Sequence, residues 1–175
     1  MPTNVGIALY TQTDSRGRKT NPHWALVAHE TDYLLPNVRV FQIGLDHSDS
    51  WILKPKTCSL ANSSSLIGIV HVAQIPKDIS WLEDFSKQFP AVKNGDNPSG
   101  LLGWSCEAWV IRFLWALVDA RMISLPCDVT QVYDYVRAKK VTMEGCRAQV
   151  PHIIPVVSLV TDELQRQMQT DIHSQ

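Results

Sequence analysis

The sequence lacks both a long apolar run and an excess of one charge. Its 175 residues carry 16 lysines and arginines against 17 aspartates and glutamates, a net charge of −1. Nucleic acids and anionic membranes attract basic surfaces, so we expect neither as a partner. No apolar run reaches the ~18 residues of a membrane-spanning helix, and the first residues lack the basic-then-apolar pattern of a secretion signal. We therefore expect a cytoplasmic protein without a membrane span.

Cysteines are few, and no pair is spaced as CxxC. The chain has four of them: Cys58, Cys106, Cys127 and Cys146. Their spacing matches neither a zinc site nor the disulfide framework of a small secreted domain. The sequence also lacks a P-loop, a dinucleotide fingerprint, an HExxH motif and an EF-hand loop. We therefore expect no metal and no cofactor.

Hydrophobic residues make up 45% of the chain and six of them are tryptophan, which is enough for one sizeable core. Patterns of apolar residues predict strands first and helices afterwards. The expected strands are residues 5–11, 23–29, 38–44 and 66–73, with a short one at 51–54, and the expected helices are residues 80–88, 105–122 and 129–140. This order indicates an α+β domain over residues 1–161. Its antiparallel sheet of about five strands packs on a buried central helix with two further helices, and residues 162–175 form a polar C-terminal tail.

The most informative stretch is Trp104-Ser105-Cys106-Glu107-Ala108-Trp109-Val110, where a cysteine opens the apolar central helix. Ser105 is a suitable N-cap for that helix. A thiol in the first turn lies at the positive end of the helix dipole, which lowers its pKa and favours the nucleophilic thiolate. The backbone N–H of Cys106 is a natural donor to an oxyanion. The alternative is that Cys106 is a small buried hydrophobic residue.

A cysteine nucleophile needs a base and a group that orients the base. His23, at the start of the second strand, is the candidate base, although a lone histidine there is often only a satisfied polar residue. Gln42 lies near His23 across a hairpin that turns near Asp32, so we expect it to accept a hydrogen bond from Nδ1–H. Gln42 is otherwise an exposed strand residue. His71 is the alternative candidate for the orienting group, although a core histidine with a hydrogen-bond partner is the favoured interpretation of His71.

Five residues complete the candidate site as substrate contacts. Tyr10 ends the first strand and is placed to contact an oxyanion or substrate, or belongs to the core. Aromatic residues near the cysteine favour an apolar substrate. The predicted substrate-binding residues are Tyr10, Trp24, His71, Trp104 and Ser105. Glu107 suits a helix N-terminus through the dipole alone and needs no catalytic role.

The pair of motifs His23-Trp24-Ala25-Leu26 and Trp104-Ser105-Cys106-Glu107-Ala108-Trp109-Val110 resembles circularly permuted papain-like families. These include the NlpC-type peptidases and the lecithin-retinol acyltransferase group, in which the histidine strand precedes the cysteine helix. The resemblance is closer to small fungal proteins of unknown function with HW and WNCQxWV motifs. It covers roughly residues 5–125. Ser105 and Glu107 depart from the Asn and Gln of that pattern, while the nucleophile and the base are both kept.

The resemblance implies a cysteine-dependent acyl-transfer enzyme, either a hydrolase, an acyltransferase or a cyclase. A Cys106–His23 dyad would act on an amide, ester or thioester of a small apolar metabolite or peptide, for example in a biosynthetic pathway. The alternative is a non-catalytic module on the same fold that binds a ligand or a protein. A third hypothesis is a structural protein whose apolar segment, Val150–Val160, builds a homodimer.

Overall fold

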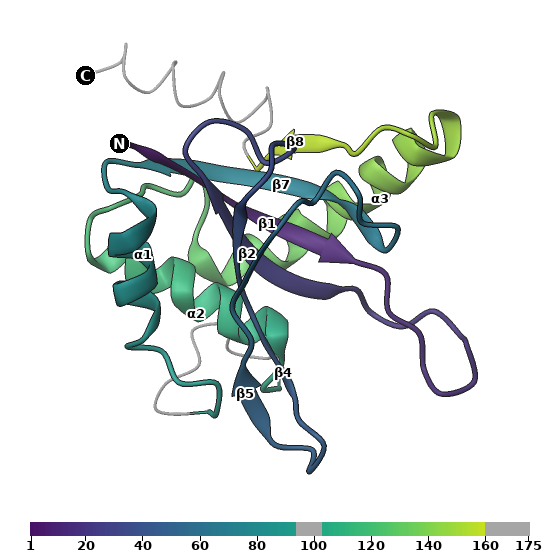
Figure 1. Ribbon diagram of the computed structural model, residues 1–175, viewed down its shortest axis with the longest axis horizontal. Coiled ribbons are helices and arrows are strands. Elements are labelled where there is room, and N and C mark those ends of the chain that lie inside the picture. Colours follow the sequence, from purple (N-terminus) through teal and green to yellow (C-terminus); the bar gives the residue numbers. More distant parts are fainter. Residues whose placement is uncertain (94–102, 160–175) are drawn as a thin grey trace.

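The computed structural model describes residues 1–93 and 103–159. A six-stranded sheet with the strand order β6-β3-β2-β1-β7-β8 forms its centre, and β4 and β5 form a separate hairpin (Figure 1). The elements are β1 (Thr3–Tyr10), β2 (His23–His29), β3 (Val38–Phe41), β4 (Ile43–Leu45), β5 (Trp51–Leu53), β6 (Lys56–Cys58), β7 (Leu66–Ile75), α1 (Ile79–Ser86), α2 (Cys106–Asp119), the single 3₁₀ turn η1 (Val129–Gln131), α3 (Val132–Gln149) and β8 (Val156–Ser158). The predicted α+β class is confirmed.

The sheet is mixed, which corrects the expectation of an antiparallel sheet of about five strands. Strands β6, β3, β2, β1 and β7 pair antiparallel, while β8 pairs parallel with β7. A parallel neighbour requires a crossover connection, and here the helices α1, α2 and α3 lie between the two strands in the chain. The described part of the Val150–Val160 segment therefore supplies an edge strand of its own sheet, and the homodimer stays a prediction.

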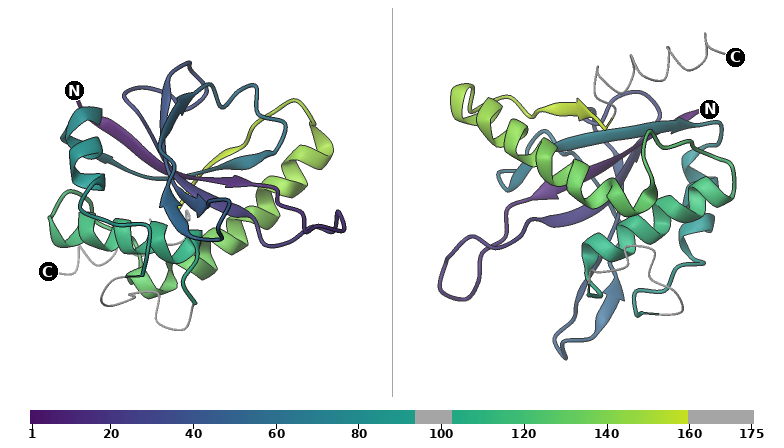
Figure 2. Two further views of the ribbon diagram at one scale, coloured as in Figure 1. Left: turned by 60° about the horizontal axis from the view of Figure 1, so that its bottom comes forward. Right: turned by 180° about the vertical axis from the view of Figure 1, so that it is seen from behind.

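Helices α2 and α3 cover one face of the sheet (Figure 2). Side chains alternate between the faces of a strand, so Leu9, Trp24 and Leu26 join the core beneath the helices. Ala25 and Val27 join a smaller core on the opposite face, closed by loop residues that include Tyr33 and Leu60. Helix α2 is the buried central helix that the sequence predicts, because nine of its residues are buried.

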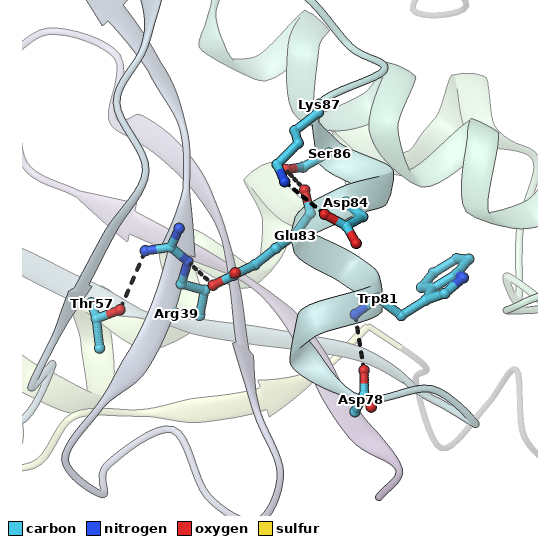
Figure 3. Close-up of polar contacts among 8 residues, drawn as sticks. All are labelled: Arg39, Thr57, Asp78, Trp81, Glu83, Asp84, Ser86 and Lys87. Carbon is cyan, nitrogen blue, oxygen red and sulfur yellow. Dashed lines mark hydrogen bonds and ion pairs between the residues drawn. The ribbon is translucent and has the colours of Figure 1, made fainter.

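Polar contacts cap helix α1 at its start and join it to the sheet through Glu83 (Figure 3). Asp78 caps it by accepting a hydrogen bond from the backbone N–H of Trp81 at 2.9 Å. Near its other end, Glu83 pairs with Arg39 of β3 at 2.7 Å, and Arg39 also donates to Thr57 of β6 at 3.3 Å. This helix therefore holds the β3–β6 edge of the sheet in place.

The strand predicted at residues 38–44 breaks at Gln42, and this break shapes the site. Along β2, strand β3 pairs with Leu26–Ala28 and reaches no further toward the start of β2. After β3 the chain leaves the sheet to form the β4–β5 hairpin, which projects away from it (Figure 1). Within the part of the chain that the structure describes, the first residues of β2, His23–Ala25, consequently have no strand partner on the β3 side. This open edge of β2 lies beside the start of α2.

Two further boundaries differ from the expectation. Helix α3 continues to Gln149 instead of ending near residue 140, because Met143 adds a third buried residue after Val132 and Val136. The helix passes through Gly145, which costs ~1 kcal/mol relative to alanine but does not end it, and stops shortly before Pro151. Strand β6 was not predicted, because its three residues are too few to show an alternation of apolar and polar side chains. The predicted tail, residues 162–175, lies outside the described residues. Among residues 1–93 and 103–159, no helix combines the length and apolar character needed to cross a lipid bilayer.

Candidate active site at the start of helix α2

Helix α2 begins as the sequence predicts. Ser105 is its N-cap, and the hydroxyl accepts a hydrogen bond from the backbone N–H of Ala108 at 3.3 Å. Cys106 is therefore the first residue of the helix. Only 7% of its surface is exposed, so the thiol lies between the helix terminus and the sheet.

The thiol of Cys106 has two hydrogen-bond partners. Its Sγ accepts from the backbone N–H of Trp24 at 3.5 Å and donates to Oε2 of Glu107 at 3.2 Å. The Trp24 N–H is available because β3 does not extend along this part of β2. The open edge of the sheet thus binds the sulfur atom in place of a neighbouring strand.

These surroundings hold the thiol in its protonated form. Burial, followed by the charge of Glu107, raises the pKa of Cys106 from 9.0 to about 12, although the Trp24 N–H opposes the rise. The prediction that the helix dipole lowers this pKa is therefore wrong. Desolvation disfavours the charged thiolate more strongly than the helix N-terminus favours it.

His23 and Gln42 are brought together as the hairpin argument predicts. The side-chain oxygen of Gln42 lies 2.8 Å from Nε2 of His23. The expected contact was with Nδ1, so the bonded nitrogen is corrected. An amide oxygen can only accept, which places the proton on Nε2 and leaves Nδ1 as the basic atom. Burial lowers the pKa of His23, while the bond to Gln42 and the charge of Glu107 oppose that change. The ring is therefore neutral at pH 7.

Cys106 and His23 line one cavity of about 390 Å³. Its other walls come from the α2 cap, the loop after β1 and the β4–β5 hairpin: Gln12, Gly44, Leu45, Trp51, Ser105 and Glu107. In the described part of the chain, no hydrogen bond joins the thiol to the imidazole. Trp24 packs on the helix-covered face, so strand alternation turns His23 the other way. The two groups therefore reach the cavity from either side of the open edge.

The other predicted substrate contacts divide between the cavity and the core. Ser105 lines the cavity. Trp24 contributes its backbone N–H, while its ring stacks on Tyr133 of α3 at 5.7 Å. Trp104 donates to the carbonyl of Ala91 at 2.8 Å, which is a structural role outside the cavity wall.

Tyr10 lies opposite His23 in the β1–β2 pairing, with the ring centroids 6.3 Å apart. Among residues 1–93 and 103–159, its buried hydroxyl has no hydrogen-bond partner, and Tyr10 is not among the residues that line the Cys106 cavity. His71 is not brought to the site either. Its Nδ1 lies 2.8 Å from the Tyr33 hydroxyl, and it lines a separate cavity of about 510 Å³. The predicted hydrogen-bond partner of His71 is thus present, whereas its predicted place in the core is wrong, because the ring is only half-buried beside that cavity.

Glu107 is the site residue that sequence reasoning missed. The residue is only 9% exposed and lines the cavity of Cys106 as well as a second cavity beneath α3. In the sequence it is an ordinary acidic residue of a first helical turn. The sequence feature that could have identified Glu107 is its position directly after the cysteine, in the first turn of a helix predicted to be buried.

The residues described in the structure contain no group of three or more His, Cys, Asp or Glu side chains arranged to hold a metal ion. Comparisons with protein-family models, curated proteins and solved structures found no significant match to the chain. The resemblance to permuted papain-like proteins therefore stays a prediction.

Proposed function

We propose that this protein is a cysteine-dependent acyl-transfer enzyme of the permuted papain-like type. One observation carries the proposal. Cys106 and His23 stand 83 positions apart in the chain and line one cavity, where Gln42 orients the imidazole. A nucleophile, a base and an orienting group are the parts that thiol catalysis needs.

Because the resting thiol is protonated, attack on the substrate has to be base-assisted. In this proposal the thiol proton turns from Oε2 of Glu107, which holds it in the resting site, toward Nδ1 of His23. His23 takes that proton as Sγ of Cys106 bonds to the carbonyl carbon of an amide, ester or thioester. The carbonyl electron pair moves onto oxygen, where the Cys106 backbone N–H, in the first turn and without an intrahelical acceptor, stabilises it. Collapse of this intermediate breaks the bond to the leaving group, which receives the proton from His23.

The acyl-cysteine is then resolved by water or an amine. His23 takes a proton from the incoming nucleophile as it attacks the acyl carbon, and the C–S bond breaks. The departing sulfur regains that proton from His23, which restores both groups. The apolar walls formed by Leu45 and Trp51 of the hairpin favour an apolar acyl group.

A second candidate function is a non-catalytic binding module on the same fold. The observation that favours it is the protonated, buried thiol, because inert structural cysteines have this environment. In that case the cavity binds a ligand and Cys106 fills space at the helix start. The two functions differ in whether the sulfur becomes acylated.

A panel of activated p-nitrophenyl esters of increasing chain length tests the proposal. We expect nitrophenol release by the wild-type chain, its loss in Cys106→Ala, and a fall of about a hundredfold or more in His23→Gln, the usual contribution of a general base. Cys146→Ala and His47→Gln are matched controls, since both residues are exposed and lie outside the cavity. Equal release by wild type and Cys106→Ala across the panel would favour the binding module.

A further inference from the structure

A second cavity, of about 110 Å³, lies behind the site and shares Glu107 with it. Residues before and in β2, the first turn of α2 and one face of α3 line it: Leu9, Asn21, Pro22, Trp24, Glu107, Tyr133, Val136, Arg137 and Lys140. A water needs ~10–15 Å³ of such space, so the cavity has room for on the order of eight non-hydrogen atoms. That is the size of one small metabolite.

The charges of this cavity are of both signs and are not paired with each other. Glu107 is 9% exposed, and its hydrogen-bond partner is the Cys106 thiol. Lys140 pairs with Glu144 at 3.3 Å, whereas Arg137 has no ion pair among the described residues. A buried carboxylate without a cation is costly. The cavity therefore favours a ligand that brings a cation to Glu107.

The remaining walls restrict that ligand further. Arg137, on α3, is free to bind a carboxylate through two N–H groups. The same cavity is also lined by Leu9, Val136 and the stacked rings of Trp24 and Tyr133. A simple amine leaves Arg137 unused, and a simple acid meets the carboxylate of Glu107. A zwitterion with an apolar side chain offers a cation to Glu107, a carboxylate to Arg137 and an apolar group to the remaining wall.

We infer that this cavity binds a free α-amino acid with an apolar side chain. Its ammonium group pairs with Glu107, its carboxylate pairs with Arg137, and its side chain lies against Trp24 and Tyr133. No contact in the cavity requires the thiol to react, so binding does not depend on catalysis by Cys106.

The consequence for the reaction rests on the proposed function. Glu107 lines both cavities, so an amine bound there lies beside the acyl-cysteine. The ammonium group gives one proton to Glu107, the neutral amine attacks the acyl carbon, and the C–S bond breaks. His23 takes the second proton from nitrogen and returns it to sulfur. The product is an N-acyl amino acid, and the bound amino acid is the acceptor.

Calorimetric titration of the full chain with L-leucine tests the binding site, in wild type and in Cys106→Ala. Isocaproate and isoamylamine are matched probes, because the first lacks only the amino group of leucine and the second only its carboxylate. We expect leucine to bind both proteins, and each truncated probe to bind about tenfold more weakly or worse.

Two variants then distinguish the contribution of Arg137 to binding from that of Glu107. Arg137→Gln should weaken leucine and isocaproate but not isoamylamine, while Glu107→Gln should weaken leucine and isoamylamine but not isocaproate. Lys139→Gln, on the same helix but outside the cavity wall, should change none of them. The inference is overturned by absent leucine binding, by equal affinity for the truncated probes, or by an Arg137→Gln variant with unchanged leucine affinity. Leucine binding without acylation of Cys106 would refute the proposed function alone.

Discussion

The raised pKa of Cys106 links the site to the stability of the whole fold at alkaline pH. The pKa rises from 9.0 to about 12 because the thiol is buried beside Glu107. The folded chain therefore holds this proton more tightly than the unfolded chain does. Its contribution to stability is complete below the unfolded pKa of 9.0 and is lost as pH rises from there toward 12.

The loss can be worked out from these two values. At about pH 10 the unfolded thiol is mostly ionised while the folded one is not, which costs about 1.4 kcal/mol of unfolding free energy relative to about pH 8. Cys106→Ala removes the titrating thiol and with it this dependence of the unfolding free energy on pH. Tyr10 and Tyr33, whose pKa values are also raised by burial, act equally in both proteins and cancel in the comparison.

Urea denaturation of wild type and Cys106→Ala at these two pH values measures the effect. Between about pH 8 and about pH 10 we expect wild type to lose about 1.4 kcal/mol more than the variant. Cys146→Ala, which removes an exposed cysteine, should follow wild type. If wild type and Cys106→Ala lose the same free energy, the thiol is not held protonated and this description of its surroundings is wrong.

Three further predictions concern the neighbours of the thiol. Gln42→Leu should lower the pKa of His23 measured by NMR titration, because the hydrogen bond that His23 donates to Gln42 raises it; an unchanged pKa would contradict the bond. Ser105→Ala should cost about 1 kcal/mol of unfolding free energy through loss of the α2 cap, and an unchanged stability would argue against that cap. Glu107→Gln should lower the pKa of Cys106 and raise its rate of iodoacetamide labelling about tenfold for every unit by which that pKa falls; a slower rate would refute the role of the charge.

Each of these variants has a matched control. Gln12→Leu changes another amide of the same cavity and should leave the His23 pKa unchanged. Ser105→Asn should keep the cap, since asparagine is among the best N-cap residues. Glu144→Gln removes an exposed carboxylate of α3 and should not alter labelling of Cys106.

Local patterns were enough to predict the elements that carry the site. The start of β2 at His23 and the start of α2 at Cys106 follow from apolar periodicity and from the N-cap preference of serine. The approach of Gln42 to His23 follows from the hairpin that joins β2 to β3, although Gln42 lies one residue beyond the last paired residue of β3. These features depend on residues that are close in sequence or are joined by one turn, so they can be predicted from local sequence patterns alone.

Features that depend on tertiary packing were missed. The break at Gln42 that frees the Trp24 N–H, the parallel pairing of β8, and the burial of Glu107 each depend on elements far away in the sequence. The sign of the Cys106 pKa change was wrong for the same reason. Helix dipoles follow from local sequence, whereas the desolvation that outweighs the dipole depends on how tightly the sheet covers the thiol.

The most direct test of the central claim is whether Cys106 becomes acylated. After incubation with a reactive p-nitrophenyl ester, digestion and mass spectrometry of the wild-type chain should locate the acyl group on Cys106. The His23→Gln variant should accumulate this adduct far more slowly, and Cys146 should stay unmodified. A chain that turns over the ester without an adduct on Cys106, or that acylates Cys106 equally fast in His23→Gln, would contradict the proposed dyad.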